Sequence, residues 1–75
     1  MKYHLICQGR LLSGAREKEC IPLIQRITKL SEEKVRTTLL NGQNKRIFSS
    51  SDKNRVKNFG RAFRNAGLEI SLLEE

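Results

Sequence analysis

Two stretches, one near each end of the chain, place apolar residues at every second position. The residues that share one face are Tyr3, Leu5 and Cys7 in the first stretch and Leu68, Ile70 and Leu72 in the last. A period of two is typical of a strand with one buried face. Residues 46–49, with Ile47 and Phe48 at their centre, predict another short strand, and the first could continue past a bulge at Gly9. Glu74 and Glu75 are expected to fray. The chain therefore predicts three short strands.

Three other stretches repeat their apolar residues at helical spacing. The first covers residues 17–30 and contains Pro22, which lacks an N–H and clashes with the carbonyl four residues back. A helix that begins at Lys18 or Glu19 places this proline in its first turn. The second helix follows Ser31, which is a natural N-cap, and ends at an Asn-Gly pair.

The third helix is the element around which the rest of the chain is expected to pack. Ser51 is the expected N-cap, with Asp52 at the positive end of the helix dipole, and Gly67 is the left-handed residue that ends the helix. Gly60 indicates close packing against another element. The apolar seam expected in the core consists of Val56, Phe59, Phe63 and Ala66.

The element order predicts the fold class. Strand, helix, helix, strand, helix, strand is the order of an α/β (α+β) two-layer sandwich, a three-stranded sheet with its helices on one face. Residues 1–75 form one domain on this interpretation, because the chain is too short for two cores. If the second and third strands are parallel, the crossover between them leaves room for the first strand.

Positive charge is concentrated in the second half of the chain. The formal net charge is +7, and residues 43–66 carry seven basic side chains and one acidic one. The cations on one side of the third helix, or just before it, are Lys45, Arg46, Lys53, Lys57, Arg61 and Arg64. We call these six residues the basic stripe. It favours an anionic partner, such as an acidic protein, a nucleic acid or an anionic lipid surface, and the alternative is a solvated face.

The apolar seam bears on which partner is favoured. Because Phe59 and Phe63 are expected in the core, no aromatic ring is left among the cations to stack on single-stranded bases. The helix could also be interpreted as a membrane-surface helix, but the flanking strands need its apolar face as core. No signal peptide or membrane span is predicted, and two unpaired cysteines fit a reducing compartment, so a cytoplasmic location is expected.

The sequence offers little support for a phosphate-binding loop, a metal site or a catalytic site. Residues 9–14 have the G-x-x-x-x-G spacing of a phosphate loop, but Ala15 and Arg16 replace the Lys-Ser/Thr pair that contacts the phosphates and the magnesium ion. His4 has no partner at metal-ligand or triad spacing and is expected on the protein surface. No enzymatic activity, cofactor, metal or small-molecule substrate is therefore predicted.

The outer face of the sheet is a second candidate contact surface. His4 and Ile6 are expected to face away from the helices, with Ile47 or Phe48 and Leu73 as further members. An apolar strip on an open sheet face can bind a protein partner or a second copy of the chain.

Residues 50–72 resemble the end of a known domain. Their helix, Ala-Gly stop and final strand are similar to those of the C-terminal domain of the bacterial ribosomal stalk protein, a fold shared by the adaptor of the N-end-rule protease. Residues 28–35 lack the Gly-Leu pattern of the stalk domain and carry two acids. The residues with which the adaptor binds an N-terminal amine have no match in this sequence. The resemblance implies a family of binding modules rather than catalysts.

The sequence thus predicts a small, non-enzymatic protein–protein interaction module of the adaptor kind. The alternative is a basic protein associated with nucleic acid or the ribosome. The partner and the oligomeric state stay open.

Overall fold

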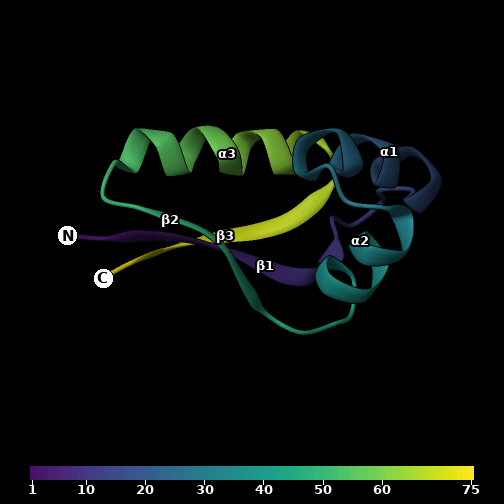
Figure 1. The fold of residues 1–75 in the computed structure, drawn as a ribbon, viewed down its shortest axis with the longest axis horizontal. Coiled ribbons are helices and arrows are strands. Elements are labelled where there is room, and N and C mark those ends of the chain that lie inside the picture. Colours follow the sequence, from purple (N-terminus) through teal and green to yellow (C-terminus); the bar gives the residue numbers. More distant parts are fainter.

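The computed structural model describes residues 1–75 and contains six elements in the predicted order. They are β1 (Tyr3–Leu11), α1 (Glu17–Thr28), α2 (Glu32–Leu39), β2 (Lys45–Ser50), α3 (Lys53–Asn65) and β3 (Leu68–Glu74). The predicted α+β class is confirmed. Figure 1 shows α3 running along the sheet, with α1 and α2 gathered at one end and both chain termini at the other. No helix has the length and apolarity needed to cross a bilayer.

The sheet has the order β2-β1-β3, and β1 is antiparallel to both neighbours. The strands β2 and β3 are therefore parallel to each other, with β1 between them. The predicted bulge is present, because the β1–β3 register shifts between Cys7 and Leu11, and Gly9 within this interval has a φ of 79°. The Gly9 carbonyl accepts a hydrogen bond from the Gly42 N–H at 2.9 Å.

The core lies between the sheet and the helices. Its buried apolar residues are Leu5, Cys7, Cys20, Ile21, Ile24, Val35, Leu39, Val56, Phe63, Ala66 and Leu68. Every helix and the strands β1 and β3 contribute to this cluster, so the helices cover the sheet face that carries Leu5 and Cys7. In so small a core, each large side chain is expected to contribute a substantial share of the stability.

The seam of α3 differs from the prediction at one position. Phe59 is 37% exposed, and Gly60 is buried instead, so the inward line of the helix runs through Val56, Gly60 and Phe63. Phe59 lies at the border of the core, with its ring centroid 4.5 Å from that of Phe48. The expectation that Phe59 is a core residue was therefore wrong.

The N-cap of α3 is Asp52 rather than Ser51. Its carboxylate oxygen Oδ1 accepts hydrogen bonds from the backbone N–H groups of Asn54 at 3.0 Å and Arg55 at 3.4 Å. Ser50 fixes the approach to this cap, because its Oγ accepts the Asp52 N–H at 3.0 Å. A carboxylate satisfies two of the unpaired donors of the first turn, which explains why the helix starts one residue later than predicted.

Pro22 lies inside α1, not in its first turn. The helix begins at Glu17, with Arg16 at the N-cap and no side-chain capping bond. Because proline has no N–H, the Lys18 carbonyl loses its usual helical partner. Both Lys18 and Pro22 are exposed, so water can take the place of the missing donor.

The junction between α1 and α2 is tightly capped on both sides. Lys29 adopts the left-handed conformation, with a φ of 63°, and its N–H donates to the Gln25 carbonyl at 2.7 Å. This ends α1 at Thr28, earlier than predicted. Ser31 caps α2 as predicted, because its Oγ accepts the Lys34 N–H at 3.2 Å.

The end of the chain is ordered into the sheet, contrary to the expectation that it frays. Glu74 belongs to β3, and Glu75 exchanges two backbone hydrogen bonds with Lys2, at 2.8 and 3.3 Å.

Candidate functional site

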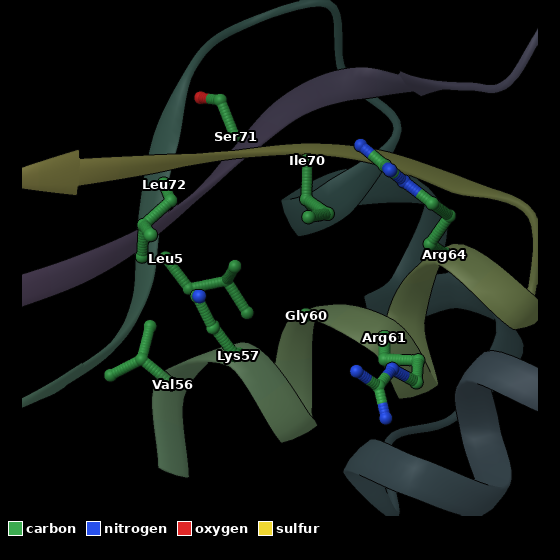
Figure 2. Close-up of a pocket in the computed structure, with 9 residues that line it drawn as sticks. All are labelled: Leu5, Val56, Lys57, Gly60, Arg61, Arg64, Ile70, Ser71 and Leu72. Carbon is green, nitrogen blue, oxygen red and sulfur yellow. The ribbon is translucent and has the colours of Figure 1, made fainter. Parts of the chain in front are cut away.

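A groove of about 370 Å³ lies between α3 and β3 (Figure 2). Its lining residues are Leu5, Val56, Lys57, Gly60, Arg61, Arg64, Ile70, Ser71 and Leu72. We call this space the α3–β3 groove. Its floor is apolar, and its cations all come from α3.

Gly60 brings the helix close to the sheet at the floor of this groove. A Cβ atom at this position would lie 3.2 Å from Leu5 Cδ1 and 3.4 Å from Ile70 Cδ1. The close packing predicted for Gly60 is thus confirmed. Any side chain longer than alanine here would have to displace these two residues or project into the groove.

Side chains of β3, which forms one wall of the groove, point alternately toward and away from α3, as in any strand. Figure 2 shows Ile70 and Leu72 pointing toward α3, while Ser71 points away from it. Leu72 remains 42% exposed, one of the few large apolar side chains in the chain that is not covered. The groove therefore presents apolar surface to solvent.

Three cations of the basic stripe border the groove. Lys57, Arg61 and Arg64 are spaced i, i+4 and i+7, which places them on one side of α3. Figure 2 shows Lys57 and Arg64 extending from α3 toward β3. None of the three forms an ion pair with a carboxylate, because the side-chain ion pairs of the chain involve Arg10, Arg36 and His4. The positive charge at the groove is uncompensated.

The other three cations of the stripe lie elsewhere. Lys53 is at the start of α3, with its Nζ 5.7 Å from the centre of the Tyr3 ring. Lys45 and Arg46 line a second groove of about 390 Å³, to which Lys34 adds a cation that is not part of the predicted basic stripe. The remaining residues of this second groove are Thr28, Leu30, Thr38, Leu39, Ile47 and Phe63. The structure therefore divides the predicted stripe into three separate places.

His4 is buried, not a surface residue as predicted. It is only 1% exposed, and both ring nitrogens have partners. Nδ1 lies 2.6 Å from Ser49 Oγ and Nε2 lies 2.9 Å from Glu75 Oε2. Since a carboxylate only accepts hydrogen bonds, Nε2–H donates to Glu75, and this bond holds the pKa of the Glu75 carboxyl below its ordinary value. Both ring nitrogens are therefore satisfied, as the burial of an imidazole requires.

The outer face of the sheet carries fewer apolar residues than expected. Ile6 pairs with Ser71, which points away from α3, and Leu73 is 46% exposed beside His4. Ile47 and Phe48 do not join them, because Ile47 lines the second groove and the Phe48 ring packs on α3. The β1–β2 register shifts beside Leu5 and Ile6, and this bulge turns both residues of β2 toward the helices.

The cysteines are packed in the core. Cys7 Sγ–H donates to the Leu39 carbonyl at 3.2 Å, and burial raises the pKa of this thiol. Cys20 is also buried and unpaired. No group of three or more His, Cys, Asp or Glu side chains is arranged to hold a metal ion.

Comparison of the chain with protein-family models, with curated proteins and with solved structures gives no match. The resemblance to the ribosomal stalk domain therefore stays a prediction.

Proposed function

We propose that this domain is a non-enzymatic protein-interaction module that binds an acidic segment of a partner protein in the α3–β3 groove. The observation that carries the proposal is the combination of an exposed apolar floor with three cations that have no carboxylate partner.

The two parts of the groove have different roles in this proposal. An aliphatic side chain that is fully buried on the floor contributes about 1.5–3 kcal/mol of transfer free energy. The cations of α3 add charge-assisted hydrogen bonds, and they steer an acidic partner to the groove and disfavour a basic one. The floor thus supplies affinity, while the cations supply selectivity.

The resemblance of residues 50–72 to the stalk and adaptor domains supports the same interpretation. It implies a family of binding modules, and the element order that it implies is the one present in this chain. Fold similarity by itself does not assign a partner, so the proposal depends on the groove.

Association with nucleic acid or the ribosome is the second candidate. The net charge of +7 and the cations of the second groove, Lys34, Lys45 and Arg46, favour it. The α3–β3 groove, however, has no aromatic ring on which a base could stack, and Phe63, the one ring at the second groove, is only 6% exposed. This candidate therefore depends on charge alone.

The test uses a synthetic peptide, Ac-Thr-Glu-Thr-Leu-Thr-Glu-Thr-NH₂, labelled for fluorescence anisotropy. The double variant Lys57→Glu/Arg64→Glu should bind it at least about ten-fold more weakly, since the two cations that extend toward β3 are lost with their charge-assisted contacts. The control is Lys18→Glu/Arg26→Glu, which changes the net charge equally at two exposed, unpaired positions of α1 outside both grooves. Its affinity should stay within about two-fold.

Two results would count against the proposal. Equal losses in the two double variants would mean that the peptide senses only net charge. Tighter binding of duplex DNA than of the peptide, with a salt slope that flattens by about one unit per cation removed, would favour the second candidate.

A further inference from the structure

We infer that the partner segment binds as an additional β-strand along the free edge of β3. This inference rests on the function proposed above, and it adds the conformation and the sequence pattern of the partner.

The two edges of the sheet differ in how they are protected. Edge strands usually carry charges, bulges or prolines that prevent pairing with another chain. The edge strand β2 has two of these devices, the cations Lys45 and Arg46 and the bulge opposite Leu5 and Ile6. The edge strand β3 pairs in regular register with β1 from Ile70 to Glu74, and its middle, Ile70-Ser71-Leu72-Leu73, has no charge, proline or bulge.

This unprotected edge is also the wall of the groove. Ile70 and Leu72 line the α3–β3 groove, and the residues of β3 from Ser71 onward are exposed. A strand added to β3 would lie about 4.8 Å from it. Every second side chain of that strand would then project beside α3, next to the floor of the groove.

The spacing of the cations fits an extended segment. Lys57 and Arg64 are separated by seven residues of helix, a rise of about 10.5 Å. Carboxylates at positions i and i+4 of a strand are about 14 Å apart, within reach of these two long side chains. The side chain at i+2 falls between them, opposite the floor at Gly60. The pattern predicted for the partner is therefore acid, any residue, aliphatic, any residue, acid.

Charge selects a partner segment rather than a second copy of this chain. If two copies paired along β3, each would bring Lys57, Arg61 and Arg64 toward the same three cations of the other. These like charges, three on each copy, oppose such pairing. An acidic strand is attracted by the same residues.

N-methylated peptides distinguish strand addition from other ways of filling the groove. Two N-methylated derivatives of the heptapeptide above, which are isomers of each other, are compared with the parent. One carries the methyl group on the backbone nitrogen of leucine, and the other carries it on that of the threonine that follows. Neighbouring N–H groups of a strand point to opposite sides, so only one of the two faces β3. One isomer should bind about ten-fold more weakly than the parent, because it loses a backbone hydrogen bond and wedges a methyl group between the strands, and the other should stay within about two-fold.

The outcomes test strand addition separately from the proposed function. If the parent peptide binds and both isomers bind equally well or equally poorly, strand addition is wrong while the proposed function stands. If the parent peptide does not bind the wild type, the strand and the proposed function both fail. Sedimentation of the free protein should show a monomer, and a dimer whose formation shields the β3 amides from hydrogen exchange would overturn the choice of occupant.

Discussion

The end of α3 offers a sharp test of the packing, because Gly67 is required there for two separable reasons. Its φ of +93° lies in the left-handed region, and a Cβ atom at this position would overlap Cys20 Sγ. For Gly67→Ala, the backbone conformation costs about 1–2 kcal/mol. The overlap costs about 1–3 kcal/mol more, as in an overpacked core. The sum is about 2–5 kcal/mol of the free energy of unfolding.

Two comparisons separate these contributions. Gly14 has a φ of +85° and no atom within 4 Å of an added Cβ, so Gly14→Ala should lose only the first 1–2 kcal/mol or so. Cys20→Ala removes the sulfur and should cost about 1 kcal/mol alone, similar to the loss of one buried methyl group. Combined with Gly67→Ala, it should restore about 1–3 kcal/mol relative to additivity. Urea unfolding followed by circular dichroism measures the four variants and the wild type. Equal losses at both glycines, or strict additivity with Cys20→Ala, would refute the packing of Gly67 against Cys20.

Three further predictions concern stability. Phe63→Ala should cost about 3–5 kcal/mol by thermal or urea unfolding, while Phe59→Ala, at a 37% exposed position, should cost less; a stability of Phe63→Ala close to that of the wild type would mean that Phe63 is not a core residue. Lys29→Gly should raise stability by about 1 kcal/mol, because it relieves a left-handed φ of 63°, and a lower midpoint in urea would contradict this. The pKa of Glu75 is lowered from about 4.5 by its hydrogen bond to His4, so its contribution is present above that pH and lost as the pH falls through the folded-state pKa. Glu75→Gln should flatten the rise of stability with pH below about 4.5, and an unchanged slope would show that the bond does not form in solution.

Local signals explain why most of the element order could be predicted. Ser31, Gly67 and the bulge glycine Gly9 each act within a few residues of the chain, so the sequence alone indicates them. The seam of α3 could not be placed to the residue. The helical spacing allows either Phe59 or Gly60 to face the core. Which of the two does so depends on how closely α3 approaches β1 and β3. That distance is a property of the packed sheet.

The candidate site was only partly predictable for the same reason. The helical period correctly groups Lys57, Arg61 and Arg64, but it cannot show that Lys45 and Arg46 lie beside another groove, since this follows from the strand order. The burial of His4 depends on a partner 71 residues away, which the β1–β3 pairing brings beside it. No periodic signal carries that information.

Binding in the α3–β3 groove can be followed residue by residue by titrating ¹⁵N-labelled protein with the heptapeptide Ac-Thr-Glu-Thr-Leu-Thr-Glu-Thr-NH₂ and recording two-dimensional NMR spectra. We expect amide shift changes at Gly60, Arg61 and residues 70–73, which line or flank the α3–β3 groove. Lys34 and Lys45, in the second groove, should not shift. Shifts confined to the second groove or to the outer face of the sheet, or no shifts at millimolar peptide, would contradict the claim that the α3–β3 groove is the binding site.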